Sequence, residues 1–183
     1  SSDVCSSDLR PIYEALSKVD IDWSKVTIFL VDDRYVPADH EESNQKLVRD
    51  TLFVNASPTV IFPDTSLPIE ECIADYEQRL PQAIDIAVLG MGDDGHIASP
   101  FPGDIDAILE EKKRVLHTMT NRFAVKDRLT VTLPVLRSAS SILFLLKGEG
   151  KKKIFAETLS ANTDPVEYPA HVLLETEIGR AHV

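Results

Sequence analysis

The 183-residue sequence has few cysteines, no long apolar run and no recognisable targeting segment. Its two cysteines, Cys5 and Cys72, are too few for a disulfide framework, so a reducing cytoplasm is the expected compartment. No apolar stretch approaches the roughly 18 residues that a membrane-spanning helix needs, and no signal-peptide pattern is present. We therefore expect a cytoplasmic protein without a membrane partner.

Basic residues are also scarce, because 19 Lys and Arg face 30 Asp and Glu and leave a net charge of -11. This charge argues against nucleic acid or an anionic membrane as the main partner. An acidic protein can still bind a small anion if basic residues or helix N-termini line the site. The length and the 43% hydrophobic content fit one domain with a sizeable core. We expect a monomer or a weak homo-oligomer.

Short apolar runs and amphipathic segments alternate along the chain. The apolar runs predict strands at residues 26–31, 84–89, 114–119, 129–133, 141–146 and 171–174. Apolar positions at helical spacing predict helices at residues 10–18, 69–80 and 151–159, and one more after the N-cap candidate Ser43. A loop with three prolines is expected across residues 58–68. This alternation predicts a single α/β domain with a doubly wound, mostly parallel sheet and helices on both faces, a Rossmann-like arrangement of three layers.

The two ends of the chain do not continue this pattern. Residues 1–9 nearly duplicate one short polar unit, and residues 178–183 break off without a recognisable element. We therefore expect non-native or disordered ends and place the domain at residues 10–177.

A glycine-rich segment, Gly90–Gly103, carries the clearest chemical signal and is called the glycine loop below. It holds four of the seven glycines and follows directly on the apolar run 84–89. A strand that enters such a turn predicts a catalytic loop at the carboxyl edge of a parallel sheet. Its histidine, His96, is suited to proton transfer because an unperturbed imidazole has a pKa of about 6.5. The alternative is a histidine that only bonds the backbone of its own loop.

Neighbouring acids and distant cations extend this candidate site. Either Asp93 or Asp94 can orient the imidazole of His96, cap the following helix or ligate a hard metal, although the spacing is poor for a metal. If the strands are parallel, Arg34 and Lys151 converge with His96 on one sheet edge. Arg34 is then a clamp for phosphate or carboxylate, or else part of a surface ion pair.

The positive charge at a helix start has two interpretations. Lys151 opens a run of three lysines at a predicted helix start. The run is either a solvated helix start or an anion contact. The second interpretation arises because positive charge at a helix N-terminus opposes the helix dipole, and a bound anion would offset that conflict. Arg128, just before a predicted strand, is a weaker candidate for the same anion.

These residues resemble the 6-phosphogluconolactonase family, within the wider glucosamine-6-phosphate isomerase/deaminase superfamily. The glycine loop matches the family pattern at nearly every position except Pro100, where the family usually has Leu. Three further motifs follow in the family's order: 32–37 with Ser43 and Asn44, 128–134, and Gly148 with Lys151. The resemblance covers about residues 10–174.

The resemblance implies a doubly wound α/β fold and hydrolysis of 6-phosphogluconolactone to 6-phosphogluconate in the oxidative pentose phosphate pathway. It implies no metal and no organic cofactor. It places the general base on His96 and makes Arg34 a further catalytic residue, with contacts to the phosphate and to the rest of the substrate. We expect Asp94 to assist His96, and the backbone at Gly92 and Gly95 to hold the developing oxyanion. Arg34, Arg128 and Lys151 are the expected phosphate-binding cations.

One family feature is not found. Family members carry a Ser-Gly-Gly phosphate loop before the first helix, and residues 1–9 do not resemble it. The first strand of the family fold is missing with that loop, which predicts a lactonase fragment truncated at the N-terminus. Two alternatives stay open: a glucosamine-6-phosphate deaminase, and an inactive module that binds a sugar phosphate. Residues 99–102 differ from the deaminase pattern, in which a carboxylate follows the histidine closely.

Overall fold

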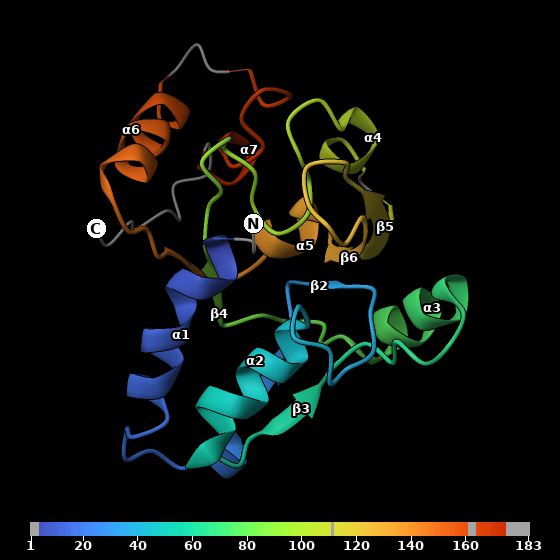
Figure 1. Ribbon diagram of the computed structural model, residues 1–183, viewed down its shortest axis with the longest axis vertical. Coiled ribbons are helices and arrows are strands. Elements are labelled where there is room, and N and C mark those ends of the chain that lie inside the picture. The colour runs from blue at the N-terminus through green and yellow to red at the C-terminus, as the bar shows by residue number, and fades with distance from the viewer. Residues whose placement is uncertain (1–3, 111, 161–163, 175–183) are drawn as a thin grey trace.

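The computed structural model describes residues 4–110, 112–160 and 164–174, in which strands and helices alternate (Figure 1). The strands are short, and they are β1 (Thr27–Phe29), β2 (Asp32–Arg34), β3 (Thr59–Ile61), β4 (Ile86–Leu89), β5 (Val115–Met119), β6 (Asp127–Val131) and β7 (Ser141–Phe144). The α-helices are α1 (Val4–Leu16), α2 (Asn44–Thr51), α3 (Ile69–Arg79), α4 (Ile105–Ile108), α5 (Leu133–Arg137), α6 (Glu149–Thr158) and α7 (His171–Leu174). Two 3-10 turns are η1 (Trp23–Lys25) and η2 (Leu52–Val54).

Two pairs of strands are parallel. In one pair β1 lies beside β3, with Thr27 opposite Thr59. In the other β4 lies beside β7, with Ile86 opposite Ser141. The connection from β1 to β3 contains α2, and the connection from β4 to β7 contains α4 and α5, so each parallel pair is joined by a long crossover. The predicted α/β fold with parallel strands is therefore confirmed.

The remaining three strands are antiparallel, in the order β2-β6-β5. Strands β5 and β6 follow one another without a helix between them, so the chain can only return by an antiparallel turn. Strand β2 pairs with β6 so that Arg34 lies opposite Arg128. The structure therefore contains both parallel and antiparallel strand pairs. Asp32–Arg34, expected to follow the end of a parallel strand, forms a short antiparallel strand of its own.

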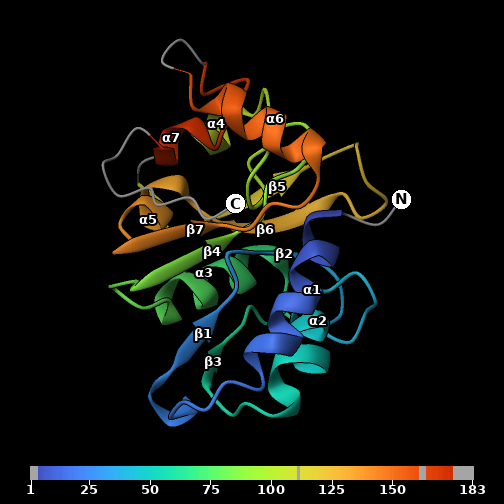
Figure 2. The ribbon, with the colours of Figure 1, turned by 90° about the vertical axis from the view of Figure 1, so that its left-hand side faces the viewer.

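The helices divide into two groups around the strands. In Figures 1 and 2, α4, α5, α6 and α7 lie on one side of β2 and β6, whereas α1, α2 and α3 lie on the other. The larger core cluster joins β4, β6, β7 and α5 and includes the fully buried Leu89, Val131, Leu136 and Ile142. A smaller cluster packs Ile28 of β1 and Phe62, just after β3, with Val48 of α2. None of the helices in the described part of the chain has the length and hydropathy that crossing a bilayer requires.

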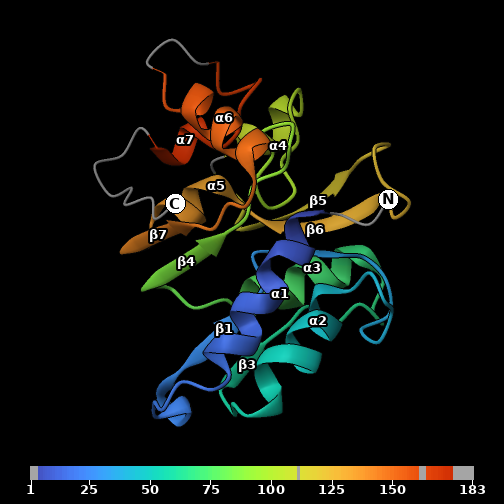
Figure 3. The same ribbon diagram turned by 60° about the vertical axis from the view of Figure 1, so that its left-hand side comes forward.

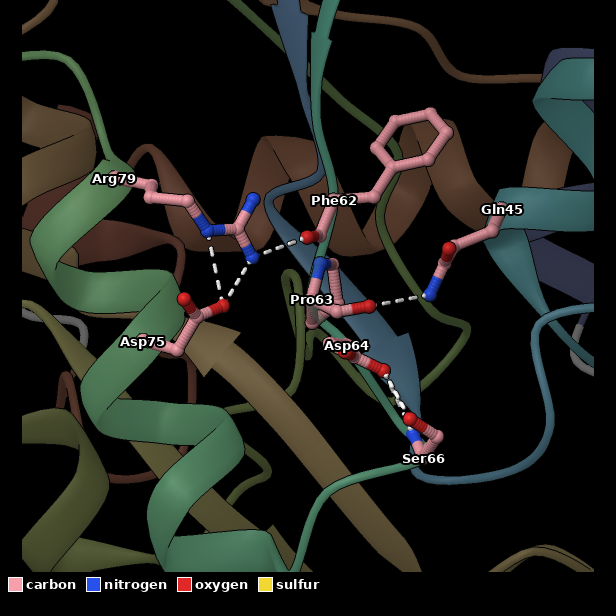
Figure 4. A network of polar contacts seen from close by, with 7 residues as sticks. All are labelled: Gln45, Phe62, Pro63, Asp64, Ser66, Asp75 and Arg79. Carbon is pink, nitrogen blue, oxygen red and sulfur yellow. Dashed lines mark hydrogen bonds and ion pairs between the residues drawn. The ribbon is translucent and has the colours of Figure 1, made fainter.

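The proline-containing segment after α2 departs from the prediction of a loop, because it includes strand β3. Its exit is fastened by side chains from two helices (Figure 4). The Arg79 guanidinium donates to the Phe62 carbonyl at 2.8 Å, and the Gln45 amide donates to the Pro63 carbonyl at 2.9 Å. These bonds need partners that are distant in sequence, so local composition did not reveal them.

Two other predicted elements need correction or extension. Residues 171–174, expected as a last strand, form helix α7, because a segment of four residues is too short to distinguish the helical period from the strand period. Helix α1 begins at Val4 rather than near residue 10 and continues through Pro11. The predicted disordered end at 178–183 lies outside the described residues, and the boundary of the domain at 10–177 stays a prediction.

Candidate active site

The glycine loop leaves the carboxyl end of β4 and closes on itself. The Gly92 N–H donates to the His96 carbonyl at 2.9 Å, and the Gly95 N–H donates to the Gly92 carbonyl at 3.1 Å. A side chain at Gly92 would place its Cβ 2.1 Å from His96 Nδ1, so only glycine leaves room for the imidazole. Gly95 has a φ of 84°, which favours glycine. Both glycines therefore shape the loop, and their amides are engaged within it.

The imidazole of His96 is buried and held on several sides. Its Nδ1 lies 2.5 Å from an Asp94 carboxylate oxygen. The ring packs against Phe101 and Phe123, with centroid distances of 4.7 and 6.1 Å. Because the contact with Asp94 uses Nδ1, Nε2 is the ring nitrogen left to exchange a proton.

The two acids beside His96 differ in their contacts. Asp94 makes the contact, whereas Asp93 is exposed. The other oxygen of Asp94 contacts the guanidinium of Arg122. Burial alone would raise the pKa of Asp94, but the hydrogen bonds and charge of His96 and the charge of Arg122 outweigh it and lower this pKa to about 2. The carboxyl group of Asp94 is therefore ionised at neutral pH.

Two buried arginines lie across neighbouring strands at the same end of the molecule. Arg34 and Arg128 are paired residues of β2 and β6, and both are at most 2% exposed. The Arg128 guanidinium lies 4.9 Å from the Phe123 ring centroid and 5.7 Å from that of Phe101. These are the rings that pack on His96, so the aromatic pair links Arg128 to the histidine. The arrangement concentrates positive charge beside the imidazole of an otherwise acidic protein.

Arg34 is positioned by the junction of β2 with α2. Its guanidinium donates to the Asn44 side-chain oxygen at 2.5 Å. The Asp33 carboxylate accepts hydrogen bonds from the backbone N–H groups of Arg34 and Asn44 at 2.8 and 2.7 Å. Burial raises the pKa of Asp33 to about 6. Asp33 thus fastens the start of α2 to the strand that carries Arg34.

The segment after His96 connects the loop to the same junction. The Ser99 hydroxyl donates to an Asp32 carboxylate oxygen at 3.0 Å, and the Ser99 N–H donates to the Thr130 hydroxyl at 3.3 Å. The loop that carries His96 therefore lies against β2 and β6, the strands that carry Arg34 and Arg128. The predicted convergence of Arg34, His96 and Lys151 on one sheet edge stays a prediction.

Lys151 is placed on the side of α6 that faces the loop. It is 3% exposed, whereas Lys152 and Lys153 are exposed and pair with acids of their own helix. Ile154, one turn further on, has an atom 3.7 Å from the Cβ position of Gly95. Residues three apart share a helix face, so Lys151 lies on the face that α6 turns toward the glycine loop.

Several contributors to the site were not predicted. Phe123 and Arg122 lie in the turn between β5 and β6, where no motif marked them. Phe101 and Asn44 belong to motifs that the sequence displayed, but their contacts with His96 and Arg34 appear only in the fold. Among the residues described, no three His, Cys, Asp or Glu side chains gather as a metal site would require.

Comparison with known proteins assigns the chain to a family. The family model described as glucosamine-6-phosphate isomerases/6-phosphogluconolactonase matches residues 7–182. This chain belongs to that family. A relative named "Probable 6-phosphogluconolactonase" from Dictyostelium discoideum is 38% identical, with 91% of this chain and 76% of the relative covered. A 6-phosphogluconolactonase from Synechocystis is 32% identical, with 90% and 72% covered.

Solved structures of the family have the same fold. The 6-phosphogluconolactonase of Thermotoga maritima aligns with a TM-score of 0.81 and 30% identity, covering 94% of this chain and 78% of its own. That of Plasmodium vivax aligns with a TM-score of 0.84 and 29% identity, covering 95% and 74%. The predicted membership of the lactonase family is confirmed, and the mixed sheet described above is part of a fold that the family shares.

Proposed function

We propose that this chain is a 6-phosphogluconolactonase, which hydrolyses 6-phosphogluconolactone to 6-phosphogluconate. The observation that carries the proposal is the buried pair of His96 and Asp94, 2.5 Å apart, within the glycine loop. Relatives that bear the name 6-phosphogluconolactonase support it at 32–38% identity over most of the chain. We propose the cytoplasm as its compartment and a monomer or weak homo-oligomer as its state.

The reaction opens an ester, so it needs an activated water and stabilisation of the negative charge that forms. His96 Nε2 takes a proton from water while the water oxygen bonds to the lactone carbonyl carbon. The bond from that carbon to the ring oxygen then breaks, and the proton on His96 passes to the departing ring oxygen. General base catalysis of this kind contributes about 10²- to 10⁴-fold in rate. No cofactor or metal takes part in the proposed steps.

Asp94 supports His96 in both halves of the reaction. Its contact with Nδ1 fixes the tautomer in which Nε2 can accept a proton. Its negative charge also stabilises the imidazolium that forms when Nε2 is protonated. The low pKa of Asp94 means that the carboxylate keeps this charge across the neutral range.

The anionic substrate is held by the cations that the fold gathers. Arg34 and Arg128 are adjacent and buried, and Arg128 contacts the Phe101 and Phe123 rings that pack on His96. A guanidinium can bind phosphate through two parallel hydrogen bonds. We assign the phosphate and the developing oxyanion to this arginine pair and a further phosphate contact to Lys151. The N–H groups of Gly92 and Gly95 already donate hydrogen bonds within the loop. The arginines are therefore better partners for the oxyanion than these backbone groups.

The deaminase alternative is disfavoured by the positions after His96. In this chain they hold Ser99, which binds Asp32, and Phe101, which packs on the imidazole. Neither supplies the carboxylate that the deaminase pattern has close to its histidine. The inactive sugar-phosphate-binding alternative keeps the arginine pair but predicts no turnover.

One set of assays separates the three functions. The chain is incubated with 6-phosphogluconolactone, and acid release is measured above the spontaneous hydrolysis of the lactone. Parallel samples test ammonia release from glucosamine 6-phosphate and binding of 6-phosphogluconate. Lactone hydrolysis without ammonia release is the expected result. Ammonia release would identify a deaminase, and binding without hydrolysis would identify an inactive module.

A further inference from the structure

The antiparallel sheet β2-β6-β5 carries a row of polar side chains across its three strands. Arg34 of β2 lies opposite Arg128 of β6, and Arg128 lies opposite Thr118 of β5. Residues directly opposite one another in an antiparallel pair share a face, with Cβ atoms about 5 Å apart. Arg34, Arg128 and Thr118 therefore form a continuous row on one face of the sheet, called the polar row below. Figure 3 shows β5 and β6 side by side.

The polar row lies on the face of the sheet that the glycine loop covers. Ser99 of that loop donates from its N–H to the Thr130 hydroxyl and from its own hydroxyl to the Asp32 carboxylate. Each of these two acceptors is two positions from an arginine of the row, and residues two apart in a strand share a face. The guanidinium of Arg128 also contacts the aromatic rings that pack on His96. The row therefore faces the loop that carries the proposed base.

The hydroxyl of Thr118 is buried, and no group in the described part of the chain forms a hydrogen bond with it. Thr118 is 5% exposed, close to the 2% of Arg34 and the 1% of Arg128, so the three side chains occupy one buried layer. A buried hydroxyl usually has a partner, because burying it without one costs free energy. The Thr132 hydroxyl, just after β6, follows this rule and donates to the Lys113 carbonyl at 2.9 Å. Thr118 thus keeps a donor in reserve beside the arginine pair.

The neighbours of this hydroxyl indicate which chemical group would bind it. A guanidinium offers only N–H donors, and a threonine hydroxyl adds an O–H donor. A ligand group that contacts Arg128 and Thr118 together must therefore accept several hydrogen bonds at once. A phosphate has three terminal oxygens that accept strongly, whereas a sugar hydroxyl has a single oxygen. The row is therefore better suited to the phosphate of a sugar phosphate than to its ring.

We propose that Thr118 is a further substrate-binding residue, whose hydroxyl donates to the phosphate held by Arg34 and Arg128. The inference rests on the proposed function, because it adds a contact to the same phosphate. Thr118 approaches from β5 and Arg128 from β6, so the two side chains bond to different oxygens of one group. The hydroxyl gains in the complex the partner that the described chain does not supply.

Thr118→Val tests this contact because it removes the hydroxyl and nearly keeps the shape of the side chain. No hydrogen bond is lost in the protein without ligand, so the variant should melt at the temperature of wild type or above it. Its affinity for 6-phosphogluconate, measured by calorimetry, should fall about tenfold or more, because a hydrogen bond to a charged group is lost. The affinity for inorganic phosphate, measured by competition, should fall by a similar factor. The KM for the lactone should rise while kcat changes little.

Two further variants serve as controls. Thr118→Ser keeps the hydroxyl and should retain most of the affinity for both ligands. Thr132→Val also removes a buried hydroxyl, but this one has a partner. That variant should melt at a lower temperature and bind both ligands as wild type does. Thr118→Val and Thr132→Val should therefore show opposite patterns of stability and affinity.

Three results would overturn the contact and leave the proposed hydrolysis unaffected. The first is an unchanged affinity of Thr118→Val for both ligands. The second is an equal loss of affinity in Thr118→Ser, since the hydroxyl would then not be the cause. The third is a loss of affinity for 6-phosphogluconate but not for inorganic phosphate, which would place the hydroxyl against the sugar.

A different result would reach further. If wild type does not bind 6-phosphogluconate, or if inorganic phosphate does not compete with it, the phosphate site of the proposed function is contradicted together with the contact of Thr118. The assay of lactone hydrolysis by wild type then shows whether the proposed reaction itself fails. Failure of the contact and failure of the function are therefore distinguishable.

Discussion

The glycine loop and the cavity bordered by α1, β1 and β4, here called the groove, are built in opposite ways. The loop is polar and closed: His96 has contacts from Asp94 and Phe101, and its own glycines fold around it. The groove is lined mainly by aliphatic and aromatic side chains. The contacts proposed for catalysis lie outside it, because the side chains that make them do not line the groove. Changes in the loop should affect turnover, and changes in the groove should not.

Among substitutions that keep both His96 and Asp94, replacing Gly92 by alanine should have the largest effect on turnover. The added Cβ would lie 2.1 Å from His96 Nδ1 and 2.7 Å from Asp94 Oδ1, so the pair must separate. A displacement of about 1 Å in a catalytic group can cost about 10²-fold in rate. We expect kcat to fall by about that factor, measured as lactone hydrolysis above the spontaneous background.

Gly150→Ala is the matched control for this substitution. Its added Cβ meets no atom within 4 Å, and it lies in helix α6. Alanine is favoured over glycine in a helix by roughly 0.5–1 kcal/mol, so this variant should keep full activity and melt at an equal or higher temperature. Equal losses of activity in the two variants would contradict the role given to Gly92.

Asp94→Asn should reduce stability in a pH-dependent way. The folded protein lowers the pKa of Asp94 from 3.8 to about 2, so its charge stabilises the fold above the unfolded pKa. This contribution, about 2 kcal/mol at most, is lost as the pH falls through about 2. Urea unfolding of wild type and variant should therefore differ at pH 6 and converge toward pH 2. A difference independent of pH would contradict the assigned charge interaction.

Asp33→Asn should have a smaller cost with the opposite pH trend. One side-chain oxygen that accepts from Ser43 and Gln45 is lost, which costs about 1 kcal/mol. Because burial raises the pKa of Asp33 to about 6, its protonated form is the one that the fold favours. The stability gained from favouring the protonated carboxyl is fully present below the pKa of 3.8 in the unfolded chain, and it is lost as the pH rises through about 6. The cost of Asp33→Asn should therefore be larger at pH 4 than at pH 7 in the same unfolding experiment.

Ile86→Ser, in the groove, should have the smallest effect. The isoleucine is 57% exposed, and substitutions at exposed positions usually change stability by about 0.5 kcal/mol or less. Lactone hydrolysis by this variant should equal that of wild type. A loss of activity as large as that of Gly92→Ala would remove the distinction between loop and groove.

Much of the fold could be predicted because its elements are marked locally. The N-cap Ser43 accepts a bond from the Gln45 N–H, and α3 ends within one residue of its predicted end. The pairing of β2 with β6 could not be predicted, since it depends on residues nearly a hundred positions apart. Strand β3 was missed because its three residues lie between prolines and are stabilised by distant contacts with Arg79 and Gln45.

The chemistry of the site was predictable to a similar extent. The glycine spacing singled out His96 and two possible acids, but only the turn of the loop selects Asp94 over Asp93. The run of three lysines could not reveal that Lys151 is the buried one, because helix orientation decides this. Phe123 and Arg122 left no signal, because they reach His96 and Asp94, respectively, from a hairpin turn.

The most direct test of the proposed mechanism is the turnover of His96→Ala compared with wild type. Lactone hydrolysis is measured above the spontaneous rate, while binding of 6-phosphogluconate and the melting temperature report that the variant is folded. We predict a fall in kcat of about 10²-fold or more with binding retained, since the base is removed and the arginine pair is not. Unchanged turnover in a folded His96→Ala variant would contradict the assignment of the base to His96.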